Sequence, residues 1–327
     1  MPGTDVWYRS EYTHSDSRIG YDFIVVTQNA QGSTERKEQL DPLNPRTFVE
    51  ESIFEMPYAP AQPWVARRSG VPQGEVASQT IYSRILEEQR DLAVYTPANY
   101  EATSALCNLV VLFDGQSYID GIAAPVILDN LLAGGAIGPT VLVLIKSNNV
   151  DSAGRNTRTF DLACDKRFAD FVVSEIVPWV RSHYRVSSAP NRAVIGGHSL
   201  GGLQATYIGF TYPDIFGNVL SESGSFFYFK GWPMTEATLS TQTGWLTKEF
   251  ATSIRKPLRL YLETGTFEGE GVAENRRMRD VLIAKGYSIT YYEYSGGHDQ
   301  LCWRASFGDG LLTLLGSQRP GKMARVR

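Results

Sequence analysis

From residue 108 onward, short apolar runs alternate with longer amphipathic segments. The strand-like runs are NLVVLF, TVLVLI, AVIG, NVLSES, LRLYLE and SITYYEY. Helical patterns lie between them, near residues 123–132, 168–180, 200–212, 273–285 and 301–315. This alternation predicts an α/β fold with a mostly parallel sheet covered by helices on both faces. An antiparallel strand pair, SQTIYSRIL and RDLAVYTP, is expected to precede it.

The first 65 residues follow a different pattern. The segments DVWYRSEY and RIGYDFIVV place aromatic residues at strand spacing, and five prolines lie between Asp41 and Trp64. These residues offer too few apolar positions for a core of their own. We therefore expect a partial β-rich segment with a Pro-rich linker over 1–65, and one α/β domain over 66–327.

Charge and composition narrow the classes of partner. A net charge of −4 gives no general attraction to nucleic acid or to an anionic membrane surface. No apolar run approaches the roughly 18 residues of a spanning helix, and the start MPGTDVWYRS does not resemble a signal peptide. The three cysteines show no C-x-x-C spacing. We expect a cytoplasmic protein with no metal, no cofactor, no disulfide framework, and no nucleic-acid or membrane partner.

The turn after AVIG carries a serine between glycines. Residues Gly197, His198, Ser199, Leu200 and Gly201 match G-x-S-x-G, in which a strained strand-to-helix turn raises the serine above a parallel sheet. A Cβ at either outer glycine is expected to collide with the neighbouring strand or helix. The backbone N–H of Leu200 would face the oxygen on which negative charge develops. Ser199 is thus a candidate nucleophile, and a glycine-rich loop without chemistry is the alternative.

A nucleophilic serine needs a general base, and the chain has four histidines. His14 lies in a polar stretch, and His183 follows a helix. His198 adjoins the serine, where the turn directs its side chain away. His298, in YSGGHDQLCW, follows a strand at the edge where parallel sheets assemble their sites. Its place in the chain suits the order Ser–acid–His, so we predict that His298 is the base.

The acid and the second oxyanion donor are less constrained. The stretch LRLYLETGTFEGEGVAENRRM offers only glutamates. Glu263 is still on the strand and Glu274 is within the next helix, whereas Glu268 and Glu270 are loop residues that physical reasoning does not separate. In LFDGQSY, the backbone N–H of Gln116 follows a buried strand and is the predicted second donor, with a plain Asp-Gly turn as the alternative.

Five segments together resemble one family. The segments LFDGQSY, GHSLGGLQA, SESGSFFY, LETGTFE and GGHDQLCWR are similar to those of the enterochelin (ferric enterobactin) esterases, which are esterase D-like α/β-hydrolases. The resemblance covers about Ser78 to Ser317. It implies an α/β-hydrolase fold and a Ser–His–Glu triad with Glu268 as the acid. Residues 1–65 resemble only the closing part of the family's N-terminal β-sandwich.

The resemblance also implies a substrate. Such esterases cleave the ester bonds of cyclic catecholate trilactone siderophores and so release iron inside the cell. The expected partner is therefore an anionic, iron-loaded small molecule, for which a local basic rim would be suitable. The implied substrate contacts are Arg158, Asp114, Trp303 and Arg304. The nearby Lys166 and Arg167 are better explained as surface charges.

Two alternatives remain. The first is a carbohydrate esterase of the same superfamily, such as a feruloyl or acetyl xylan esterase. The turn at Asp114, where those relatives commonly have His-Gly, and the lack of an export signal favour the siderophore esterase. The second is a binding protein that keeps only the hydrolase scaffold. The presence of Ser199, His298 and Glu268 argues against it.

Overall fold

A computed structural model describes residues 3, 10–28, 32–102, 104–147, 157–228 and 244–316. At its centre lies an eight-stranded sheet with the order β13-β12-β11-β10-β8-β9-β7-β6. Its strands are β6 (Glu75–Ser83), β7 (Glu88–Thr96), β8 (Asn108–Leu112), β9 (Thr140–Ile145), β10 (Ala193–His198), β11 (Asn218–Glu222), β12 (Arg259–Gly265) and β13 (Ser288–Tyr294). Strands β8 to β13 are parallel, whereas β7 is antiparallel to both β9 and β6. The predicted mostly parallel sheet and the antiparallel pair are confirmed.

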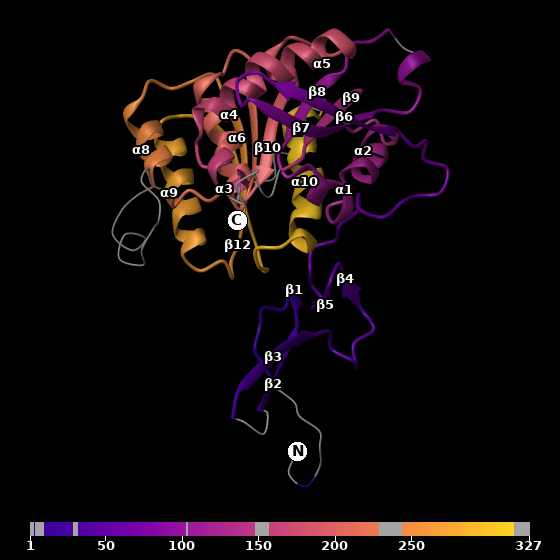
Figure 1. The fold of residues 1–327 in the computed structure, drawn as a ribbon, viewed down its shortest axis with the longest axis vertical. Helices are drawn as coiled ribbons and strands as arrows, with labels where there is room; N and C mark the ends of the chain where they lie inside the picture. Colours follow the sequence, from indigo (N-terminus) through magenta and orange to yellow (C-terminus); the bar gives the residue numbers. More distant parts are fainter. Residues whose placement is uncertain are drawn as a thin grey trace.

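Helices cover both faces of this sheet (Figure 1). One face carries α4 (Lys166–Phe171), η2 (Val172–Ile176), α5 (Val177–His183), α6 (Leu200–Thr211), α8 (Trp245–Thr252) and α9 (Glu270–Ala284). The other face carries α1 (Gly115–Asp120), α2 (Ala124–Ala133) and α10 (Gln300–Leu315). Further short elements are η1 (Tyr100–Ala102), α3 (Thr157–Asp161) and η3 (Pro190–Arg192). In the described ranges, no helix has the length and apolar character needed to cross a membrane.

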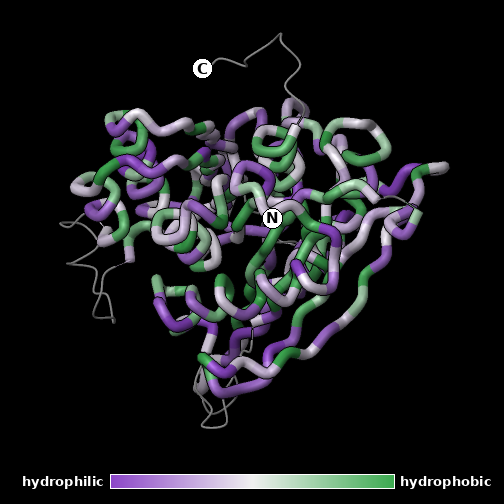
Figure 2. The backbone as a smooth tube through the Cα atoms, turned by 90° about the horizontal axis from the view of Figure 1, so that it is seen from above, coloured by the Kyte–Doolittle hydropathy of each residue, from purple (hydrophilic) through white to green (hydrophobic). Residues whose placement is uncertain are grey.

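The core explains why the central strands are continuously apolar. Leu109 and Val111 of β8 pack into the cluster on one face, and Val110 and Leu112 pack into the cluster on the other. All four are fully buried. Hydrophobic stretches therefore run through the interior of the α/β body (Figure 2). Because helices cover both faces, strand side chains that point to either face must be apolar.

The N-terminal segment is rich in strands, as expected, and extends from the α/β body (Figure 1). Its small antiparallel sheet has the order β1-β5-β4, and β2 pairs with β3 in a hairpin. The bounds are β1 (Arg18–Tyr21), β2 (Phe23–Gln28), β3 (Thr34–Gln39), β4 (Thr47–Phe48) and β5 (Glu51–Glu55). Most of the predicted strand DVWYRSEY lies outside the described residues. The backbone N–H of Arg18 donates to the Ser295 carbonyl at 2.9 Å, so β1 rests on the loop that precedes α10.

Candidate active site

Ser199 occupies the sharp turn between β10 and α6. Its backbone angles are φ 57° and ψ −124°, a conformation that residues with a side chain rarely adopt. Hydrogen bonds hold the turn on both sides. The Ser199 N–H donates to the Glu222 carbonyl at 2.9 Å, and the Ser199 carbonyl accepts from the Ser225 N–H at 3.1 Å. These are the features of the strained strand-to-helix turn that the G-x-S-x-G pattern predicts.

Two glycines at this turn allow a close approach of the backbone, but they are not both the ones that were predicted. A Cβ on Gly197 would lie 2.7 Å from the carbonyl carbon of Gly201, so the first glycine is needed as expected. The prediction was wrong for Gly201, where a Cβ would meet nothing closer than Asp114 Oδ2 at 3.4 Å. The close approach is at Gly202 instead, where a Cβ would lie 2.6 Å from the Ser221 hydroxyl. Helix α6 therefore approaches β11 through its third residue.

His298 and Glu268 lie together at the carboxyl ends of neighbouring strands. His298 is in the loop between β13 and α10, and Glu268 is in the loop after β12. The His298 Nδ1 is 2.8 Å from Glu268 Oε2. The Glu268 side chain is only 4% exposed, whereas the imidazole is 44% exposed. Glu270 begins α9 with an exposed side chain. Of the two loop glutamates, the structure brings Glu268 to the histidine.

The Glu268 carboxylate is fixed by donors on its other oxygen. Oε1 accepts hydrogen bonds from the Ser223 hydroxyl at 2.6 Å, the Gly265 N–H at 2.6 Å and the Tyr294 hydroxyl at 3.3 Å. This leaves Oε2 directed at His298. Sequence reasoning gave no role to Ser223 or Tyr294. Their signal was positional, because Ser223 directly follows β11 and Tyr294 ends β13, the two neighbours of β12.

Trp303 connects the histidine loop to the serine turn. Its ring stacks on His198, with centroids 4.4 Å apart, and meets His298 edge-on at 4.8 Å. Its indole N–H donates to the Ser223 hydroxyl at 2.9 Å. Because His198 directly precedes Ser199, this one ring brings His298 and the serine turn to the same place. Trp303 is largely buried but also lines the cavity beside His298, so its predicted contact with substrate stays a prediction.

The other histidines are placed away from a general-base role. His198 is buried, and its Nε2 lies 2.9 Å from the Ser117 hydroxyl. Burial lowers the pKa of His198 to about 4, although the nearby Asp114 carboxylate opposes this shift. His198 is therefore neutral at physiological pH. His14 and His183 are exposed.

The two predicted oxyanion donors belong to the first turns of two helices. Leu200 is the first residue of α6, and Gln116 is in the first turn of α1. The first N–H groups of a helix have no acceptor within that helix. Helix α1 follows β8 and helix α6 follows β10, and these strands are neighbours in the sheet. The two predicted oxyanion donors therefore come from adjacent strand ends.

Asp114 and Arg158, both predicted as substrate contacts, bind each other. The Arg158 Nε donates to Asp114 Oδ1 and its Nη2 to Oδ2, each at 2.7 Å, in a forked ion pair. Burial alone would raise the pKa of Asp114, but the hydrogen bonds and charge of Arg158 hold this pKa below its usual value. The guanidinium is 25% exposed and has N–H groups beyond the two that the carboxylate uses.

The remaining basic candidates are used elsewhere. The Arg304 Nε donates to the Gln62 side chain at 2.6 Å, and its guanidinium lies over the Phe48 ring at 4.5 Å. Arg304 therefore packs against the N-terminal segment, and its predicted contact with substrate stays a prediction. Lys166 is exposed and forms an ion pair within its own helix, and Arg167 donates to a backbone carbonyl. Both behave as the surface charges expected of them.

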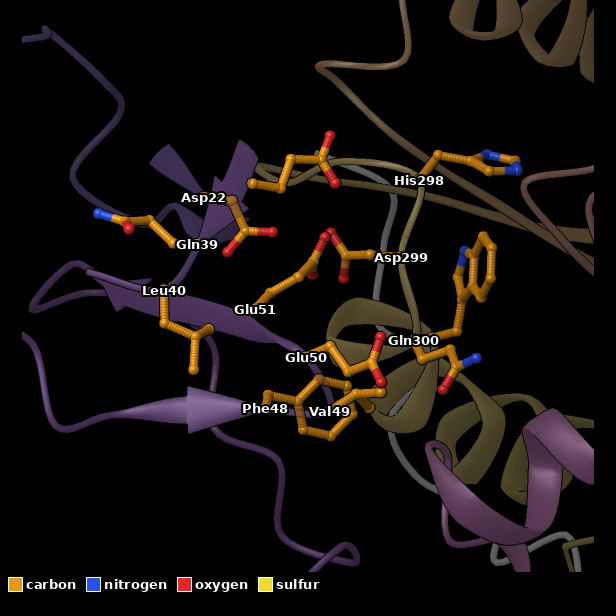
Figure 3. A pocket seen from close by; sticks show the side chains of 12 residues that line it. Asp22, Gln39, Leu40, Phe48, Val49, Glu50, Glu51, His298, Asp299 and Gln300 are labelled. Carbon is orange, nitrogen blue, oxygen red and sulfur yellow. The ribbon is translucent and has the colours of Figure 1, made fainter. Parts of the chain in front are cut away.

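A cavity of about 750 Å³ separates the N-terminal strands from the His298 loop (Figure 3). In Figure 3, the carboxyl groups of Glu51 and Asp299 point toward each other, while the His298 ring points away from the strands. Burial, together with the charges of Asp299 and Asp22, raises the pKa of Glu51. Among the lining residues, five are acidic and none is Lys or Arg. This side of the site is therefore negative, contrary to the expected basic rim.

Comparison with known proteins agrees with this geometry. The family described as "Putative esterase" matches residues 83–314. The iron(III) enterobactin esterase of Dickeya dadantii is 30% identical over 99% of this chain and 80% of its own length. The crystal structure of the enterobactin esterase from Shigella flexneri, determined in the presence of enterobactin, is 28% identical, with a TM-score of 0.76 over 92% of this chain and 78% of that one.

A ferulic acid esterase from Anaeromyces mucronatus has a TM-score of 0.62 over 79% of this chain and 96% of its own, at 20% identity, and so shares the fold alone. The enterobactin esterases, by contrast, are similar to this chain in both fold and sequence over nearly its whole length. The chain therefore belongs to the putative esterase family and, within it, to the enterochelin esterases.

Proposed function

We propose that this protein is a cytoplasmic serine esterase that hydrolyses the ester bonds of a catecholate trilactone siderophore. Ser199 is the nucleophile, His298 the general base and Glu268 the acid that orients it. The observation that carries the proposal is the bond of 2.8 Å between His298 Nδ1 and a Glu268 carboxylate that three other donors hold in place. A base oriented in this way has its second nitrogen available to accept a proton.

The reaction has two steps. In the first, the Ser199 hydroxyl attacks the ester carbonyl and its proton passes to His298 Nε2, while the Glu268 carboxylate stabilises the imidazolium. The backbone N–H groups of Leu200 and Gln116 bind the negative oxygen of the tetrahedral intermediate. His298 then gives its proton to the leaving serine oxygen of the lactone, and Ser199 keeps the acyl group. In the second step, water attacks the acyl carbonyl while His298 accepts its proton, and His298 then returns this proton to the Ser199 oxygen as the acyl–serine bond breaks and the free acid leaves.

The substrate proposal rests on the relatives. Three of the similar proteins are iron(III) enterobactin esterases and a fourth is an iron(III) salmochelin esterase, so we infer a trilactone of this type, carrying iron, as the substrate. Arg158 lies near the predicted oxyanion donor Gln116, because it forms an ion pair with Asp114 two residues earlier. Its remaining N–H groups suit the oxygens of a catecholate, which a guanidinium can bind in a forked geometry.

A product assay on the purified protein tests this function. Enterobactin-type trilactones, with and without iron, are compared with feruloylated and acetylated sugars, and products are identified by mass. We expect turnover of the trilactone and little of the sugars. Hydrolysis of the sugars alone would instead establish a carbohydrate esterase. Labelling of Ser199 by an organophosphonate, absent in Ser199→Ala, distinguishes either enzyme from a binding protein.

A further inference from the structure

Two carboxyl side chains beneath the site have no part in the proposed mechanism. Glu222 ends β11, and Glu263 is its register partner on the neighbouring parallel strand β12. Residues paired in this way point to the same face of the sheet, about 4.8 Å apart. Both side chains are fully buried. Two acids are therefore adjacent in the core.

The polar contacts of the pair are few and neutral. Glu222 Oε2 lies 2.5 Å from the Tyr118 hydroxyl, and Glu222 Oε1 accepts from the Ser306 hydroxyl at 3.1 Å. Neither side-chain oxygen of Glu263 makes a hydrogen bond of normal geometry within the part of the chain that the structure describes, and the donor beside it is the Ser306 hydroxyl that already donates to Glu222. A buried carboxylate without a donor is unfavourable, whereas a carboxylic acid can itself donate.

No cation compensates the pair in the described ranges. The other titratable groups that face it are Tyr118 of α1, Tyr261 of β12, Tyr292 and Tyr294 of β13, Cys302 and Asp309 of α10, and Glu268. On the remaining side, the register partner of Glu222 is His198, which burial keeps neutral. Two ionised carboxylates cannot persist side by side under these conditions. Burial accordingly raises the pKa of both Glu222 and Glu263.

Both residues also hold the site through their backbone. The Glu222 carbonyl accepts the N–H of Ser199, and the Glu263 carbonyl accepts the N–H of Ser223 at 2.8 Å. Ser223 in turn binds the Glu268 carboxylate and the Trp303 indole. The pair therefore lies where the serine turn, the acid and α10 meet.

We propose that Glu222 and Glu263 form a proton-holding carboxyl pair that positions the Ser199 turn and the Ser223–Trp303 contact, and that loss of its proton at alkaline pH lowers turnover. The proposal rests on the proposed esterase activity for its kinetic readout. The two glutamates are positioning residues, because neither is directed at the reacting ester. Glutamine has the shape of a protonated glutamate and cannot lose that proton, so it should substitute for the acid form.

The experiment compares Glu222→Gln, Glu263→Gln and Glu222→Ala with the parent protein and with Glu270→Gln, a change at an exposed glutamate. Hydrolysis of p-nitrophenyl acetate is measured from pH 6 to 10, which makes the result independent of the natural substrate. We expect each glutamine variant to keep kcat within about threefold of the parent at pH 7. Their kcat should lack the alkaline decline of the parent, with KM unchanged, and Glu222→Ala should lose at least tenfold.

Two results would overturn the proposal. One is a loss of tenfold or more at pH 7 in a folded glutamine variant, which would mean that the ionised carboxylate is required. The other is a pH profile of kcat in which the glutamine variants decline at alkaline pH as the parent does, or in which the parent shows no such decline.

The Tm measured as a function of pH provides a second readout, which does not depend on the proposed esterase activity. If no ester is hydrolysed, the parent should still lose Tm with rising pH more steeply than the glutamine variants. Equal slopes of Tm against pH in the parent and the glutamine variants, or a glutamine variant that does not fold at pH 7, would also refute the proposal that the pair holds a proton.

Discussion

Replacing Glu268 with glutamine tests the site at its best-defined contact. The Oε1 position faces the backbone N–H of Gly265, a donor that cannot turn away, so the amide oxygen of glutamine must stay there. The amide NH₂ then takes the position of Oε2 and donates to His298 Nδ1. The imidazole is forced to carry its own proton on Nε2, where it can no longer accept one from Ser199.

Locking a triad histidine in the wrong tautomer reduces kcat by about 10⁴-fold, which corresponds to about 5 kcal/mol of transition-state stabilisation. We expect a loss of this order for Glu268→Gln, measured as kcat for p-nitrophenyl acetate and for the trilactone. Glu270→Gln is the matched control and should stay within about twofold of the parent. The reasoning is refuted if Glu268→Gln keeps more than a tenth of the parent activity, or if Glu270→Gln loses more.

Four further predictions follow from other contacts. Ser199→Ala and His298→Ala should each lower kcat by about 10⁵–10⁶-fold. The control changes Ser182→Ala and His183→Ala, at two adjacent exposed residues of α5, should not lower kcat, and a tenth of the activity remaining in either site variant contradicts the assignment. Arg158→Ala should destabilise the fold by about 3 kcal/mol in urea unfolding, because it leaves the Asp114 carboxylate buried and unpaired, and adding Asp114→Asn should recover most of this loss. Glu51→Gln should raise kcat/KM for the iron-loaded trilactone about two- to threefold at low salt, with no gain at 0.5 M salt or on p-nitrophenyl acetate, because it removes a negative charge from the cavity wall; an equal gain on the neutral ester would exclude charge as the cause. Between the unfolded Glu pKa of about 4.3 and the Glu222 pKa of about 8, the native state holds a proton that the unfolded chain has released, so stability should fall as pH rises, by up to about 1.4 kcal/mol per pH unit, and Glu222→Gln should flatten this slope.

Sequence periodicity predicted the long elements because burial imposes a regular pattern on them. Strands β8 to β13 and the five long helical patterns each keep apolar residues where the core requires them. Helices α1, α3 and α8 were not predicted, since 6, 5 and 8 residues are too few for a helical period to be recognised. The turn at Ser199 could be predicted because its glycines and its place between a strand and a helix are local features.

Two of the predicted substrate contacts lie next to each other on α10. Trp303 and Arg304 follow the histidine motif directly, and both were expected at the substrate. Successive helix residues point about 100° apart, so only one of the two could face His298. Trp303 turns inward onto the two histidines, and Arg304 turns toward the N-terminal segment. Proximity in sequence to a motif did not specify which face of α10 each residue occupies.

The ion pair between Arg158 and Asp114 could not be predicted, because the two residues are 44 positions apart and each has its own plausible role. It changes how the effect of Arg158 on catalysis should be interpreted. Asp114 adopts the left-handed conformation directly before α1, so its position sets that of the Gln116 N–H two residues later. An arginine that only held this turn would act on the oxyanion donor, and Arg158→Ala would lower kcat for every ester. An arginine that also bound catecholate would raise KM several-fold for the trilactone alone. The split between kcat and KM across the two substrates therefore separates positioning from substrate binding at the same guanidinium.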